Sequence, residues 1–256
     1  MSRDRSAWSL AAATFTSLPS RTPADPRMTL GGPALLLAPV MALLPAAVAV
    51  LVVGLATWLT LPATPAAVLT VTGLVLATSG RQLVDLARTV GEVTQPVGEL
   101  TRQVGEVTPQ VVGEGAADDG GTRHQALATA AVVLVLLAQV AAVAAMLWTD
   151  TAWWWVLAGV LLARVPLLVA YRPGVAASAV GLVVVGVLVG GSALLGLPWW
   201  PALVALVGAA LPVWWLLRVL AERRGVLEAS AAGAIVELGQ AGALTALAML
   251  LHRLPL

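Results

Sequence analysis

The residues best suited to chemistry begin in a short polar window, TSGRQLVDLARTVGE at residues 78–92, which ends a long uncharged run. Asp85, Arg88 and Glu92 are spaced i, i+3 and i+7, so a helix would place them on one face. Such a set is suited to hold Mg²⁺ against a phosphate group, because hard cations prefer oxygen ligands and phosphoryl transfer needs its charge neutralised. The same spacing also occurs in ordinary Asp–Arg pairs on exposed helices, and both interpretations remain open.

Two other charged residues stand inside apolar segments. Glu237 lies about two turns into the last apolar segment, and Arg164 lies within an earlier one. An ionisable group near the centre of a membrane helix costs about 2.5 kcal/mol or more, so such residues are candidates for function. A purely structural pair of Arg164 with Glu237 is the alternative.

A repeat and a second polar cluster follow the window. Glu92, Glu99 and Glu106 recur every seven residues within 90–112, where glycines and prolines oppose a stable helix. A membrane-surface segment or a loop is therefore favoured there. In DDGGTRH, residues 118–124, the acids and Arg123 could contact a phosphate or a metal. A glycine-rich loop at a membrane boundary accounts for these residues equally well.

The composition indicates an integral membrane protein. Of the 256 residues, 59 % are hydrophobic and only 11 % are charged, whereas soluble domains carry about 25 % charged residues. A net charge of +1 argues against a nucleic-acid partner. There is no cysteine and there are only two histidines, which excludes thiolate chemistry and multi-histidine metal sites. All fourteen basic residues are arginine, and lysine and asparagine are absent, which indicates a GC-rich bacterial genome.

The apolar runs predict an all-α fold with about seven transmembrane helices in one membrane domain, 1–256. A crossing needs about 20 residues, so the uncharged run from Met28 to Gly80 holds two, with a turn at Leu61 and Pro62. The domain comprises an interfacial N-terminus (1–32), two helices (33–80), a cytoplasmic polar loop (81–124) and five helices (125–251). The predicted crossings are 33–60, 63–78, 125–148, 152–171, 174–195, 200–217 and 230–251.

The arginine distribution predicts the orientation. With the N-terminus in the cytoplasm, twelve of the fourteen basic residues fall on the inner face and only Arg253 on the outer face, as the positive-inside rule requires. This orientation places 81–123 and 218–229 on the same side, where the two polar regions could face one another.

In order along the chain, several segments resemble the cobalamin synthase (adenosylcobinamide-GDP ribazoletransferase) family. FTSLP at 15–19, followed by LLLAPVMALLPA, looks like the opening of that family. TSGRQLVDLARTVGE is similar to its acidic box, and GVLEASAAGAIVELGQ resembles its closing segment. Gly80, Leu86 and Glu237 match family positions, while the acids of the family box fall on other residue types, Val84 and Arg88 among them. The resemblance covers nearly the whole chain in order and hydropathy.

The resemblance implies a Mg²⁺-dependent transferase in a bacterial inner membrane. Such an enzyme joins α-ribazole, or its 5′-phosphate, to adenosylcobinamide-GDP and releases GMP. The lipid bilayer, the cobinamide nucleotide and the ribazole are the expected partners. Because most carboxylates of the box are missing, an inactive relative that acts as a membrane binding or structural component is an alternative, and a small transporter is another. The expected roles are catalytic for Asp85, Arg88 and Glu237, substrate-binding for Arg81, Arg123 and His124, and metal-binding for Asp85 and Glu92.

Overall fold

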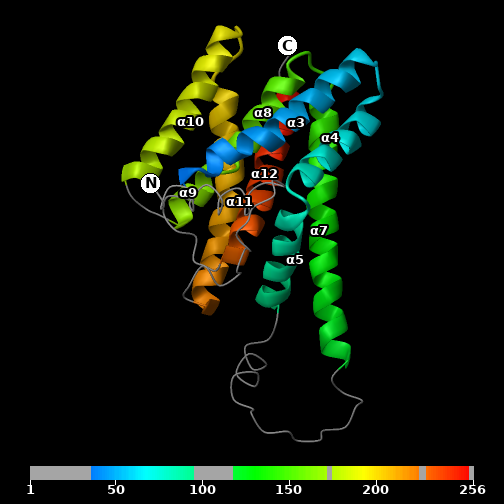
Figure 1. Cartoon of the computed structure of the whole chain (residues 1–256), viewed down its shortest axis with the longest axis vertical. Coiled ribbons are helices and arrows are strands. Elements are labelled where there is room, and N and C mark those ends of the chain that lie inside the picture. The colour runs from blue at the N-terminus through cyan, green and yellow to red at the C-terminus, as the bar shows by residue number, and fades with distance from the viewer. Residues whose placement is uncertain (1–35, 95–117, 172–174, 225–228, 254–256) are drawn as a thin grey trace, which may run out of the picture.

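The computed structural model describes residues 36–94, 118–171, 175–224 and 229–253, and these residues form helices and short turns with no strand among them. Figure 1 shows the helices gathered into one bundle. In chain order they are α3 (Ala38–Trp58), α4 (Ala63–Ala77), α5 (Arg81–Thr94), α7 (Asp118–Met146), α8 (Ala152–Leu162), α9 (Val165–Tyr171), α10 (Val175–Leu194), α11 (Trp200–Arg224) and α12 (Ala229–Leu251).

Five stretches are long and apolar enough to cross a membrane, which confirms an all-α, multi-pass membrane protein. They are α3, most of α7, the pair α8–α9, most of α11 and most of α12. Each of the seven predicted crossings falls on a helix or a helix pair. The second, α4, is only fifteen residues long and reaches spanning length only together with α5, while the apolar part of α10 covers only Ser178–Leu194.

The second and fourth crossings are broken, and the sequence explains both breaks. The axes of α4 and α5 meet at 85°. Ser79 and Gly80 there have φ of 53° and 66°, and the Gly80 N–H donates to the Val75 carbonyl at 2.9 Å, a helix end that glycine adopts without strain. Between α8 and α9 lies Arg164. Pro166 follows two residues later and lacks the N–H that would continue the helix.

Helix α12 is the centre of the bundle, because α5, α7, α8 and α11 all pack against it. The approach of α11 to α12 depends on glycine. A Cβ added to Gly208 would lie 2.7 Å from the carbonyl oxygen of Gly242, so only a residue without a side chain fits. Close backbone contact through small residues is the usual way in which membrane helices associate.

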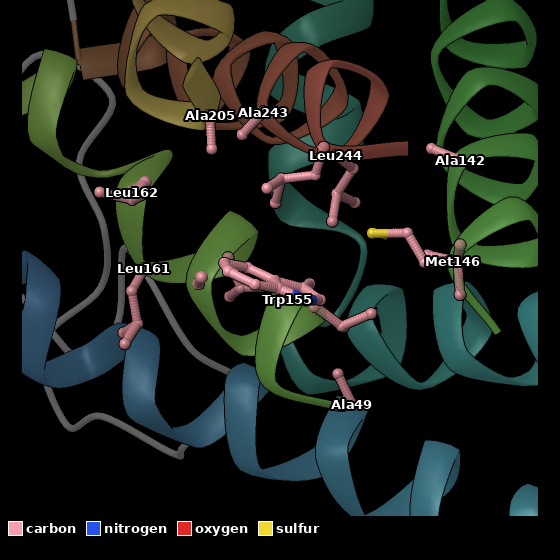
Figure 2. Close-up of a cluster of buried hydrophobic side chains, with 14 of the residues drawn as sticks. Ala49, Ala142, Met146, Trp155, Leu161, Leu162, Ala205, Ala243 and Leu244 are labelled. Atoms are coloured by element: carbon pink, nitrogen blue, oxygen red, sulfur yellow. The ribbon is translucent and has the colours of Figure 1, made fainter. Parts of the chain in front are cut away.

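The larger apolar cluster of the bundle surrounds Trp155 of α8 (Figure 2). Met146 from α7 and Leu244 from α12 pack there, and all three side chains are fully buried. A second cluster contains Leu86 of α5, Leu167 of α9 and Ile235 of α12.

A polar layer separates the two apolar clusters. Four polar or charged residues lie next to the larger cluster in the sequence. Gln139 is on α7, Arg164 lies between α8 and α9, and Glu237 and Gln240 are on α12. All four side chains are buried. The interior therefore consists of two apolar clusters with these four polar or charged residues between them.

Candidate functional site

Helix α5 carries the polar window, and the predicted helical spacing of Asp85, Arg88 and Glu92 is confirmed. The helix buries Gln82, Leu86 and Thr89, at i, i+4 and i+7. This stripe sets the orientation of the charged residues. Asp85 and Glu92 flank it and are half-buried, whereas Arg81 and Arg88 are exposed. The segment 81–94, predicted as part of a polar loop, is thus a packed helix.

Asp85 lies directly against α12. A Cβ added to Gly233 would come within 2.9 Å of the Asp85 carboxyl carbon, so the glycine leaves the room that this carboxylate occupies. Glu237 lies four residues further along α12, which places it one turn deeper on the same face. The window and the closing segment, about 150 residues apart in the chain, are therefore side by side.

The two predicted metal ligands are separated along their helix. Asp85 and Glu92 are seven residues apart, which corresponds to about 10 Å along the axis of an α-helix. Across the described residues, no group of three or more histidine, aspartate or glutamate side chains comes together. Mg²⁺ in proteins usually takes only one or two carboxylates, with substrate phosphates and water completing its shell. Helix α5 thus has enough carboxylates to bind Mg²⁺, but the two carboxylates do not converge on one position.

His124, predicted to bind substrate, connects α7 to α5. Its Nδ1 lies 3.3 Å from the hydroxyl of Thr94, and this contact joins the start of one helix to the end of the other. The DDGGTRH segment forms the first turns of α7, so the glycine-rich loop predicted for it is wrong. The side chains of Asp118, Asp119 and Arg123, and most of the 90–112 repeat, lie outside the described residues.

The most extensive polar arrangement in the described bundle is a hydrogen-bonded row inside it. Arg164 Nη1 donates to the Val160 carbonyl at 2.7 Å and to Gln240 Oε1 at 3.1 Å. Gln240 Nε2 donates to Gln139 Oε1 at 3.4 Å, and Gln139 Nε2 donates to Glu237 Oε2 at 2.9 Å. We call Arg164, Gln240, Gln139 and Glu237 the buried row.

The buried row changes the predicted relation between the two intramembrane charges. Two glutamine side chains connect Arg164 to Glu237, where sequence analysis offered a simple pair as one interpretation. Sequence analysis missed both glutamines. The available signal was a glutamine inside each of two long apolar runs, since an amide in a membrane must find hydrogen-bond partners.

Two buried donors in this region have no partner within the described part of the chain: Arg164 Nε and Gln82 Nε2. Leaving such a donor unsatisfied costs about 1–3 kcal/mol. The polar residues between the two apolar clusters are therefore incompletely satisfied, while Glu237 accepts a hydrogen bond from Gln139.

At the same end of the bundle lie the last turns of α5 and α11 and the first turns of α7 and α12 (Figure 1). The sequence predicted that the polar regions 81–123 and 218–229 lie on the same side, and this prediction is confirmed for the helix ends that flank these two regions. Arg218 and Glu222 in this part of α11 form an exposed ion pair at 3.1 Å.

Comparison with protein-family models, with curated proteins and with solved structures finds no match to the chain.

Proposed function

We propose that the chain is a membrane transferase of the cobalamin synthase type. It would join α-ribazole, or its 5′-phosphate, to adenosylcobinamide-GDP and release GMP in the last steps of cobalamin biosynthesis. The observation that supports this proposal is the packing of α5 on α12. It brings the two segments that carry the family resemblance into contact at Asp85 and Gly233.

In this reaction a hydroxyl oxygen of the ribazole attacks the phosphate attached to cobinamide. One phosphorus–oxygen bond forms, and the bond to GMP breaks with its electron pair leaving on GMP. Glu237, held by Gln139, would take the proton of the attacking hydroxyl. Arg88 would neutralise phosphate charge, and Arg81, Arg123 and His124 would bind the substrates.

Asp85 and Glu92 would supply the protein ligands of Mg²⁺, which neutralises phosphate charge when it is bound. The site would open to the cytoplasmic side of a bacterial inner membrane. The arginine bias of the sequence supports that side, because six of the fourteen basic residues lie in or beside the segments that connect the helix ends at the polar end of the bundle.

The test uses membranes that contain the full chain, supplied with adenosylcobinamide-GDP, α-ribazole and Mg²⁺. We expect cobalamin and GMP to form in equal amounts, and we expect Asp85→Ala and Glu237→Gln each to reduce the rate by at least ten-fold. Val84→Ala is the matched control, because Val84 lies beside Asp85 on α5 but is exposed. No product above an empty-vector control, with expression confirmed, would refute the proposal.

A second candidate function is a catalytically inactive relative that binds these substrates or a protein partner in the membrane. The separation of Asp85 from Glu92 by two turns favours it, because a shared metal site needs converging ligands. This candidate predicts binding of adenosylcobinamide-GDP without turnover. It also predicts that Asp85→Ala and Glu92→Ala leave complementation of a cobalamin-synthase-deficient strain unchanged from the wild-type chain.

A further inference from the structure

A cavity of about 420 Å³ opens at the end of the bundle opposite to the polar helix ends. It lies between the last turns of α3 and the turn that joins α7 to α8. The residues that line it include Asp150, two threonines (Thr57 and Thr149) and two tryptophans (Trp58 and Trp153). The other lining residues are apolar, and neither arginine nor histidine is among the residues that line it.

The charge in this cavity is negative and uncompensated. Asp150 is exposed, and no ion pair or hydrogen bond of its carboxylate is found in the described chain. Helices α3 and α7 both end here, so the negative ends of two helix dipoles point toward the cavity, against the positive end of α8 alone. His252 and Arg253 lie in the turn that follows α12 and do not line the cavity. The electrostatics therefore favour a cation.

The tryptophans restrict the kind of cation. The face of an indole attracts alkylammonium groups, and it does so more strongly when the cation is desolvated. A second cavity of about 280 Å³ shares Thr57 and Leu147 with the first and continues toward the start of α4. Leu61, Pro62 and Ala66 line it, and it contains no charged residue. The cavity that contains Asp150 thus adjoins one that is lined by threonines and apolar residues and has no charged residue.

We propose that these two cavities together bind an alkylammonium amphiphile. Its cationic head would lie between Asp150 and the indoles of Trp58 and Trp153, and its alkyl chain would lie in the second cavity. A membrane lipid with a trimethylammonium head and a free alkylammonium compound offer the same chemistry. The site is independent of the transferase proposal, because it lies at the other end of the bundle and uses none of the residues assigned there.

The test is native mass spectrometry of the full chain released from maltoside micelles, which counts bound molecules directly. With added dodecyltrimethylammonium we expect one bound molecule per chain. Asp150→Asn should weaken binding about ten-fold, since loss of one close charge interaction corresponds to about 1.4 kcal/mol. Glu222→Gln removes an exposed carboxylate near the other end of the bundle and should leave binding unchanged.

Two further measurements keep the proposal falsifiable. Dodecyl sulfate, with the same chain and the opposite charge, should not bind, and Trp153→Leu should weaken dodecyltrimethylammonium binding at least three-fold. Competition by short-chain phosphatidylcholine, but not by phosphatidylglycerol, would identify a lipid as the source. Displacement by free alkylammonium compounds alone would identify a soluble one. Equal binding of the cation to the wild type and to Asp150→Asn, or equal binding of dodecyl sulfate, would overturn the proposal.

Discussion

Helix α5 and the buried row both place charged or polar side chains against α12, but they do so in different ways. On α5 the arginines are exposed and the carboxylates are half-buried, so water or a bound ligand can reach them. In the buried row, Arg164 and Glu237 are 1 % and 4 % exposed, and amide side chains from two helices connect them. Charges at an accessible surface can remain separate, whereas charges inside a membrane bundle must be connected.

The difference has a functional consequence. The arginines of α5 are exposed and its carboxylates are half-buried, while the side chains of the buried row are hydrogen-bonded to one another inside the bundle. In the proposed reaction, the substrate phosphates would bind mainly at the exposed face of α5. The buried row connects α7, α8–α9 and α12, and it holds Glu237 one turn from the contact of Asp85 with Gly233.

The largest expected effect follows from removing one charge of the buried row. Arg164→Met should lower the free energy of unfolding by about 3–5 kcal/mol, because it leaves Glu237 without a compensating charge. Unfolding in mixed micelles with dodecyl sulfate, followed by helical circular dichroism, measures this change. The double variant Arg164→Met/Glu237→Met should lose less than Arg164→Met alone. A cost below about 1 kcal/mol for the single variant would contradict the importance given to the row.

A smaller effect is expected where α5 contacts α12. Gly233→Ala should cost about 1–3 kcal/mol, because the new methyl group would overlap the Asp85 carboxylate. The same unfolding measurement applies. Adding Asp85→Gly, which removes both the carboxylate and the Asp85 Cβ that the new methyl group would meet, should restore part of the loss. If the double variant is as unstable as Gly233→Ala alone, Asp85 is not the residue that the methyl group displaces.

Two buried glutamines give a matched pair. Gln139→Leu removes the donor to Glu237 and should cost about 1–3 kcal/mol. Gln82→Leu removes an amide nitrogen that has no partner within the described residues, so it should be neutral or stabilising. Both variants replace a fully buried glutamine with leucine in the same bundle, and unfolding midpoints compare them. Equal losses would mean that hydrogen bonding in the row does not distinguish the two sites.

The smallest effect is expected at the exposed pair Arg218–Glu222, whose side chains are 64 % and 65 % exposed. Arg218→Met should change the free energy of unfolding by no more than about 0.5 kcal/mol, because water and salt screen an exposed ion pair. Unfolding at low and high salt checks this expectation. A loss comparable to that of Arg164→Met would erase the distinction between surface and buried charges.

Much of the fold was predictable because membrane crossings depend on long apolar runs. The turn at Leu61 and Pro62, the helical spacing on α5 and the common side of the polar ends were all predicted from sequence. The break at Arg164 was not, although Pro166 gave a local signal for it. Hydropathy counts apolar residues along one segment and does not locate interruptions within it.

The candidate site was predictable only in part. Spacing along one helix identified Asp85, Arg88 and Glu92, and burial cost identified Arg164 and Glu237 as unusual. The connections through Gln139 and Gln240 depend on how three helices pack, which one sequence does not specify. The contact of Asp85 with Gly233 is likewise a product of tertiary packing.

The packing of α5 against α12 supports the proposed function, and it can be tested directly because the chain contains no native cysteine. Asp85→Cys with Gly233→Cys places two thiols at this contact, and Val84→Cys with Gly233→Cys is the control on the exposed side of α5. In membranes treated with a mild oxidant, we predict that the first pair forms an intramolecular disulfide in most of the protein while the control pair remains reduced. Equal cross-linking of the two pairs, or none in the first, would contradict the account.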